Sequence, residues 1–66
     1  MKEQYETLEL RRDGGLLWLV LNRPQSLNAM NRPLVEELHH VLDELHADQS
    51  VRVVILRGAG RAFCAG

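Results

Sequence analysis

The spacing of apolar and polar residues predicts two strands at the start of the chain. From Tyr5 to Arg11 the pattern alternates loosely, with leucines on one side, which predicts a half-exposed strand. From Leu16 to Leu21 the chain is continuously apolar, which predicts a second strand with Trp18 packed in the sheet. Asp13-Gly14-Gly15 lies between the two and tolerates positive φ, so the strands are predicted to form a β-hairpin.

A helix is predicted after the second strand, because leucine and valine recur at a spacing that places them on one helical face. Asn31 can cap the start of this helix, and Pro33 is tolerated in its first turn. Glu36 and Glu37 are expected to form a charged first turn that suits the helix dipole, and Asp48-Gln49-Ser50 ends the helix. The predicted apolar face comprises Leu34, Leu38, Val41, Leu42 and Leu45.

The run from Val51 to Leu56 is β-branched and apolar, which is typical of a strand buried on both faces of a mostly parallel sheet. Pro24 ends the second strand, since it cannot donate to a ladder. Strand, helix and strand then make a right-handed β-α-β unit with parallel strands. The fold class is therefore α/β, an N-terminal hairpin plus a β-α-β unit, and the loops Gln25 to Met30 and Gly58 to Gly66 are expected at one edge.

The glycine-rich loop matches neither of two common phosphate-binding motifs. No Lys-Ser or Lys-Thr follows its glycines, which excludes a P-loop. The dinucleotide fingerprint begins at Gly58 and Gly60 but has Phe63 where the third glycine belongs. Glycine and alanine dominate the loop, so we expect it to bind a ligand through its backbone amides, with Gly66 among the residues that allow close approach.

Composition and charge exclude several classes of protein. The chain has 66 residues, 45% apolar and 26% charged, which is typical of one small globular unit. A net charge of −1 gives no electrostatic case for nucleic acid or for an anionic membrane. No secretory signal or spanning segment is recognisable, so a cytoplasmic location is expected. Cys64 is the only cysteine, so no intrachain disulfide is expected, and no metal site is predicted.

Three segments together resemble the N-terminal part of the crotonase superfamily, the enoyl-CoA hydratase/isomerase family. These are LVLNRPQSLNAM at 19–30, the helix LVEELHHVLDEL, and VRVVILRGAGRAFCAG at 51–66. The pattern N-R-P-x-x-x-N-A-[ML], followed after one helix by a strand and G-x-G-x-A-F-x-A-G, is specific. The resemblance implies that residues 1–66 are an N-terminal fragment of a domain with a crotonase (ClpP-like) fold.

By this resemblance, the loop after the second strand contributes to a coenzyme A site, in which Gln25, Ser26, Leu27 and Ala29 line the pantetheine and nucleotide end. The carbonyl of Ala65 is similar to one that meets the adenine amine. Family members often place Lys or Arg near Gln25 to Leu27, and this chain has none there. The implied substrate is an acyl-CoA or enoyl-CoA thioester, with coenzyme A as part of the substrate and no separate cofactor.

The resemblance also implies where catalysis would occur. The first oxyanion amide belongs to the residue after Gly66, and the second amide and the acid/base carboxylates lie further on, so no catalytic residue is expected within 1–66. Two hypotheses follow. The chain is part of an enzyme that stabilises an enolate-type intermediate, expected as a trimer or hexamer when complete, or it is a non-catalytic piece that pairs with other crotonase-fold chains. The choice between hydratase, isomerase, hydrolase, dehalogenase and decarboxylase stays open.

Several reactive side chains have plainer interpretations. The three histidines, His39, His40 and His46, are interpreted as a solvated helix surface, and Cys64 as a small buried thiol. Asn28 is expected to close its own loop through hydrogen bonds to the backbone. Solvated charge is the expected role of Arg52, Arg57 and Arg61.

Overall fold

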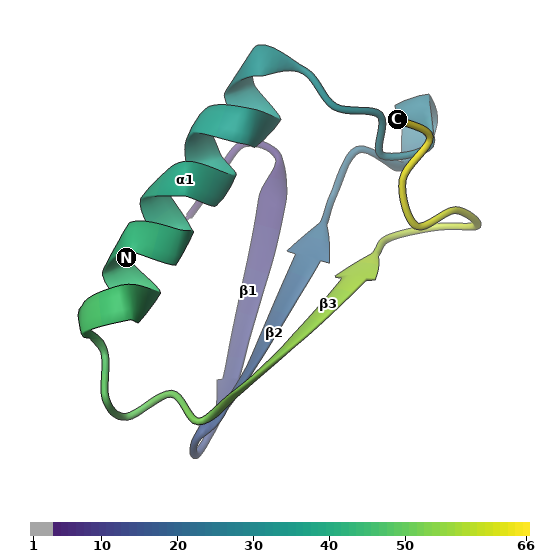
Figure 1. Ribbon diagram of the computed structural model, residues 1–66. Coiled ribbons are helices and arrows are strands. Elements are labelled where there is room, and N and C mark those ends of the chain that lie inside the picture. Colours follow the sequence, from purple (N-terminus) through teal and green to yellow (C-terminus); the bar gives the residue numbers. More distant parts are fainter. Residues whose placement is uncertain (1–3) are drawn as a thin grey trace.

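The computed structural model describes residues 4–66, which form a mixed sheet with one long helix against it (Figure 1). The three strands lie in the order β1-β2-β3, with β1 antiparallel to β2 and β2 parallel to β3. The predicted hairpin and β-α-β unit are thus confirmed. The elements in chain order are β1 (Leu8–Asp13), β2 (Leu16–Leu21), the 3₁₀ turn η1 (Pro24–Ser26), α1 (Arg32–Ala47) and β3 (Val53–Gly58).

The first strand lies later in the chain than predicted. It begins at Leu8 and not at Tyr5, because the backbone before it is held by the helix. The N–H groups of Glu6 and Thr7 donate to the Glu37 carboxylate at 2.8 and 2.7 Å, and the Thr7 hydroxyl donates to the same carboxylate. Glu37 therefore anchors the N-terminal segment to α1. The expected charged first turn is wrong for both Glu36 and Glu37, because α1 begins at Arg32 and its first turn holds no acidic residue.

The ends of α1 follow the predicted capping. The Asn31 side chain accepts a hydrogen bond from the N–H of Leu34 at 3.0 Å, and Asp48 is the C-cap. Leu34 and Val41 are fully buried. Leu42, predicted on the same face, is instead 55% exposed, because it lies at the side of the stripe that contacts the sheet.

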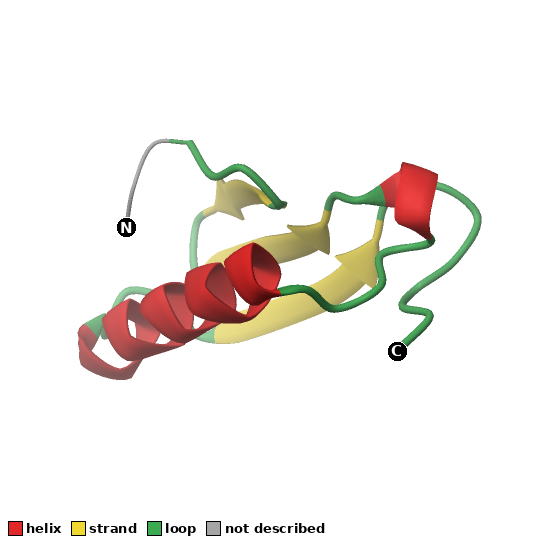
Figure 2. Cartoon of the chain, turned by 90° about the horizontal axis from the view of Figure 1, so that it is seen from above, coloured by secondary structure: helices red, strands yellow, loops and turns green. Residues whose placement is uncertain are grey.

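The hydrophobic core lies between α1 and the first two strands. Viewed from above, the helix runs along one face of the sheet and leaves the other face uncovered (Figure 2). Trp18, which was predicted to pack in the sheet, is half-buried, and it points away from the side of β2 that carries the core leucines. The core cluster comprises Leu8, Leu19, Leu21, Leu34 and Val41, with Tyr5, Leu10, Leu38, Leu45 and Cys64 packed against it.

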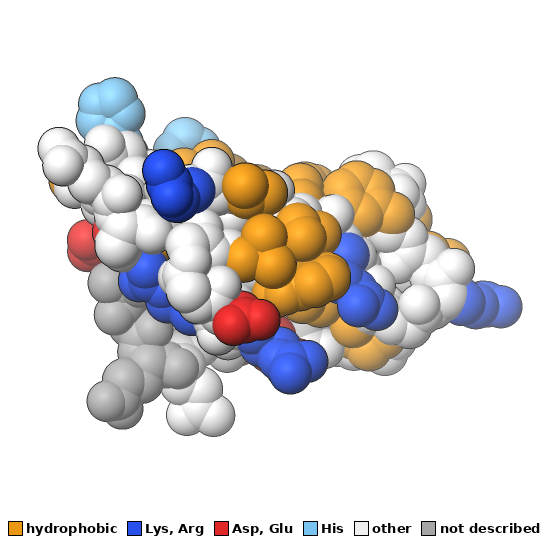
Figure 3. Space-filling view, turned by 90° about the horizontal axis from the view of Figure 1, so that it is seen from below, with side chains coloured by type: hydrophobic (Ala, Val, Ile, Leu, Met, Phe, Trp, Pro, Cys, Tyr) orange, Lys and Arg blue, Asp and Glu red, His pale blue; other side chains and the backbone are white. Residues whose placement is uncertain are grey.

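The expected burial of β3 on both faces is wrong for this chain. Val53, Val54 and Leu56 are 51%, 43% and 48% exposed, respectively. β3 is an edge strand within residues 4–66, and α1 packs over β1 and β2 instead. Viewed from below, apolar side chains gather at the surface in the middle of the molecule, among charged ones (Figure 3). No helix in the described part of the chain is long and apolar enough to cross a membrane.

Candidate functional site

Two loops leave the sheet at the same edge, as the parallel pairing of β2 and β3 requires. Leu21 at the end of β2 lies opposite Gly58 at the end of β3. We call residues 22–30 the first loop and residues 59–66 the second loop. The N–H of Ala59 donates to the carbonyl of Leu21 at 2.8 Å, so the loops are already joined where they begin. Figure 1 shows both at one end of the molecule.

The first loop is a compact turn closed by its own hydrogen bonds. Asn28 donates its N–H to the Arg23 carbonyl at 2.8 Å, and its Oδ1 accepts the N–H of Arg23 at 2.7 Å. The predicted loop-closing role of Asn28 is thus confirmed. The Arg23 guanidinium donates to the Ala29 carbonyl and, at 3.4 Å, to the Ser26 hydroxyl. Leu27 and Asn28 both have left-handed backbones, with φ of 52° and 57°.

Asn28 also joins the two loops, which the sequence interpretation did not foresee. Its Nδ2 donates to the carbonyls of Ala59 and Ala62 at 2.9 and 2.8 Å. The Asn28 side chain is fully buried. A third link comes from the N–H of Met30, which donates to the Gly66 carbonyl at 2.8 Å. The sequence contains one indication of this role. Asn28 is the second asparagine of N-R-P-x-x-x-N-A, a polar residue that lies in a loop beside the small residue Ala29.

Two glycines allow the second loop to fold closely onto its surroundings. A Cβ built on Gly58 would lie 2.4 Å from the Phe63 carbonyl oxygen and 2.5 Å from that of Ala62, which no real side chain permits. Gly60 has φ of +78°, and a Cβ there would lie 2.9 Å from Cβ of Pro24 in the first loop. Gly58 is therefore required by crowding, and Gly60 by both backbone conformation and contact.

The residues predicted to bind the substrate all lie in these two loops. Those of the first loop range from exposed to half-buried, and the two of the second loop are exposed. Gly66 has φ of +114°, and a Cβ added there would meet no atom within 4 Å, so glycine is favoured by conformation and not by crowding. The first group is Gln25, Ser26, Leu27 and Ala29, and the second is Ala65 and Gly66.

The second loop offers donors from its backbone. Gly60 and Arg61 form a turn, and within the described residues the N–H groups of Gly60 and Phe63 donate to no protein acceptor, whereas the carbonyls of Ala62 and Gly66 are both engaged. Peptide groups that are not paired within the protein must bind water or a ligand. The loop can thus donate backbone N–H groups to an oxygen-bearing ligand, and this binding would need no contribution from an ionisable side chain.

The other reactive side chains are placed as expected for structural or solvated residues. His39, His40 and His46 are exposed on α1, whereas Cys64, expected to be buried, is only half-buried against the core cluster. The three arginines after the helix, Arg52, Arg57 and Arg61, are exposed. Among residues 4–66 no group of His, Cys, Asp and Glu side chains is arranged to hold a metal ion.

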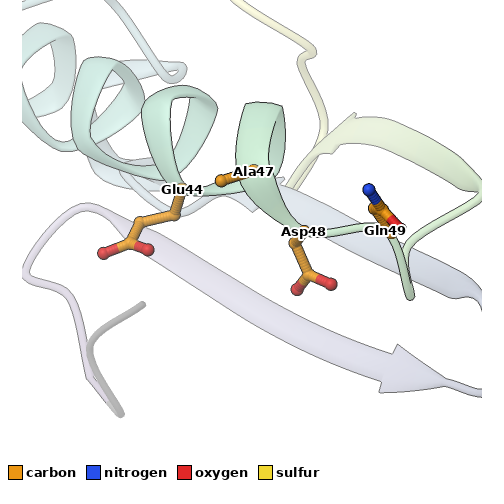
Figure 4. A pocket seen from close by; sticks show the side chains of 4 residues that line it. All are labelled: Glu44, Ala47, Asp48 and Gln49. Atoms are coloured by element: carbon orange, nitrogen blue, oxygen red, sulfur yellow. The ribbon is translucent and has the colours of Figure 1, made fainter.

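A depression at the far end of α1 has a different character. It is lined by Glu44, Ala47, Asp48 and Gln49, whose side chains project from the end of the helix and the turn that follows (Figure 4). The Ser50 hydroxyl and N–H donate to Asp48, and the Arg12 guanidinium lies 3.2 Å away. These contacts lower the pKa of Asp48 below its ordinary value, and the hydrogen bonds from Ser50 have the largest effect. This cluster joins β1 to the C-cap of α1.

Known proteins are similar in sequence to most of this chain. The chain is 44% identical over 62 residues to a "Probable enoyl-CoA hydratase" of Rhizobium meliloti, an alignment that covers 94% of this chain and 24% of that protein. It is 42% identical over 52 residues to the 1,2-epoxyphenylacetyl-CoA isomerase of Escherichia coli, covering 79% of this chain and 20% of that enzyme. The chain thus spans about a quarter of the length of these relatives.

Solved structures show the same arrangement of elements. The structure of a probable enoyl-CoA hydratase/isomerase from Mycobacterium abscessus superimposes with a TM-score of 0.91 at 44% identity, covering 96% of this chain and 24% of that one. The family model described as enoyl-CoA hydratase/isomerase matches residues 16–66, which include β2, α1, β3 and both loops. This chain belongs to the enoyl-CoA hydratase/isomerase family.

Proposed function

We propose that the first and second loops form part of an acyl-CoA binding site in an enzyme of the enoyl-CoA hydratase/isomerase type. The substrate would be an acyl-CoA or enoyl-CoA thioester. Chemistry would proceed through an enolate-type intermediate whose oxyanion is stabilised by backbone N–H groups. The observation that carries the proposal is the pair of loops at one sheet edge, which hydrogen bonds from Asn28 and Met30 hold together.

The proposed roles of single residues follow the family resemblance. Gln25, Ser26, Leu27 and Ala29 would line the pantetheine and nucleotide end of coenzyme A, and the carbonyl of Ala65 would accept from the adenine amine. The exposure of Ala65 and Gln25 is consistent with these roles. The Arg23 guanidinium is committed to Ala29 and Ser26, so its proposed contribution is to shape the first loop.

Titration of the chain with coenzyme A, followed by amide chemical shifts, tests the proposal. We expect shifts in residues 22–30 and 59–66 and none at the hairpin turn. Gly66→Val forces a branched side chain into φ of +114°, at a cost of about 1 to 3 kcal/mol, and should weaken binding. Cys64→Ser keeps size and backbone and serves as the control. Absence of loop shifts at millimolar coenzyme A, or loss of binding in Cys64→Ser alone, would contradict the proposal.

The chain alone is expected not to hydrate crotonyl-CoA, because the acid/base carboxylates are proposed to lie beyond Gly66. The loss of absorbance of the conjugated thioester measures hydration directly. Clear turnover by the pure chain would refute this assignment of the catalytic groups.

A second candidate function is that of a non-catalytic assembly piece. The exposed apolar side chains of β3 favour it, since an uncovered edge strand can pair with another chain. Coenzyme A binding separates the two candidates, because only the first requires it.

A further inference from the structure

The buried amide of Asn28 contacts both loops of the candidate site. Its Oδ1 accepts from the N–H of Arg23, and its Nδ2 donates to the carbonyls of Ala59 and Ala62. These partners fix the orientation of the amide, because a peptide N–H requires the oxygen end and two carbonyls require the nitrogen end. No polar atom of the side chain is left without a partner.

The two bonds from Nδ2 determine the direction of neighbouring peptide groups. In a trans peptide the carbonyl and the following N–H point in opposite directions, and no peptide of the described chain is cis. Because the carbonyls of Ala59 and Ala62 point toward Asn28, the N–H groups of Gly60 and Phe63 point away from it. Neither N–H has a protein acceptor within residues 4–66.

The surroundings of Asn28 leave no room for a different arrangement. The side chain is 0% exposed, and a Cβ at Gly58 would lie 2.7 Å from its Nδ2. Aspartate would keep the acceptor but lose both donors and would set an oxygen against two carbonyls. This position therefore requires a side chain of asparagine's length that donates two hydrogen bonds and accepts one.

We infer that Asn28 is a positioning residue, which directs the N–H groups of Gly60 and Phe63 away from the junction of the two loops and thereby sets the geometry of the ligand site. It acts through Ala59 and Ala62 and need not touch the ligand. That the ligand is an acyl-CoA rests on the proposed function. The role of Asn28 in fixing the loop geometry does not depend on it.

Amide hydrogen exchange on three variants of the chain tests this role. Asn28→Asp keeps the acceptor for the Arg23 N–H, so the Arg23 amide should keep its protection from exchange. The protection factors of the Ala59 and Met30 amides should fall by at least about tenfold. Asn28→Ala should lose protection at all three amides. Gln49→Glu makes the same amide-to-carboxylate change at an exposed position outside both loops and should behave like the parent chain.

The outcomes are distinguishable. Equal loss at Ala59, at Arg23 and throughout β1 and β2 in Asn28→Asp would overturn the inference, since Asn28 would then only contribute to overall stability. Unchanged protection at Ala59 and Met30 would overturn it as well. Coenzyme A affinity is measured in parallel, and the inference expects at least about a tenfold loss in Asn28→Asp. If the parent chain binds no coenzyme A, the proposed function fails, and the exchange pattern still decides the role of Asn28.

Discussion

At the scale of single residues, the candidate site depends on the absence of side chains as much as on their presence. Gly58 lies under the carbonyls of Ala62 and Phe63, and the second loop could not fold back over a larger residue. Gly14 is required for another reason, because it has φ of +61° in the hairpin turn with no atom within 4 Å of a Cβ. Gly58 is therefore required because a side chain there would clash, and Gly14 because a side chain there would strain the backbone.

Gly58→Ala should destabilise the chain by about 1 to 3 kcal/mol and displace the second loop, since the obstructing atoms are backbone oxygens that cannot rotate away. Gly14→Ala should cost about 1 to 2 kcal/mol through φ alone and leave the loop unchanged. Urea denaturation gives the stabilities, and the Ala59 amide exchange rate reports on the loop. An unchanged Ala59 rate in Gly58→Ala would contradict the crowding argument.

The contacts of Asp48 predict a dependence of stability on pH. Its pKa in the folded chain is lowered, chiefly by Ser50 and then by Arg12. A carboxyl of this kind stabilises the fold above its unfolded pKa of about 3.9, and the contribution is lost as the pH falls through the lower folded pKa. Asp48→Asn should therefore be less stable than the parent at pH 7 and approach it at about pH 2. Asp43→Asn, which removes an exposed charge from α1, is the control, and an equal effect of both variants at pH 7 would contradict the prediction.

At the scale of elements, α1 contacts the sheet along a narrower stripe than its sequence suggests. Leu34→Ala should destabilise the fold by about 2 to 5 kcal/mol, because Leu34 is 0% exposed and its removal leaves a cavity. Leu42→Ala makes the same change at a residue that is 55% exposed and should cost much less. Thermal unfolding followed by circular dichroism compares the two. Similar losses would mean that Leu42 is buried in solution.

The elements could be predicted from sequence because their signals are local. The alternating and continuous apolar runs gave the strands, and Asn31, Pro33 and Asp48 gave the ends of α1. Burial of β3 could not be predicted, since it depends on which elements cover the strand and not on the strand itself.

The candidate site was predictable only in part. The topology placed both loops at one edge, since the ends of parallel strands coincide. The bonds from Asn28 to Ala59 and Ala62 join residues 31 and 34 positions apart, and no local pattern specifies such a pairing. The same is true of the carboxylate of Glu37, which binds the backbone of Thr7 across 30 positions.

At the scale of the whole molecule, β3 leaves a strand edge and apolar side chains uncovered, so the chain is expected to self-associate. Leu56→Lys adds a charge to this strand and should reduce association, whereas Gln49→Lys adds the same charge in an exposed turn and should not. Sedimentation velocity over a range of concentrations measures the effect. A parent chain that stays a cooperative monomer at all concentrations would contradict this expectation.

The parallel pairing of β2 with β3 also determines the order in which the molecule can assemble. The hairpin of β1 and β2 joins neighbouring residues and closes a short loop, so it can form within microseconds. Pairing β2 with β3 must first bring together segments separated by the whole of α1, which is entropically costly and slow. The loops meet only after that step, so the candidate site is the last part of the chain to assemble, and a nascent chain that ends before β3 would have its hairpin but no site.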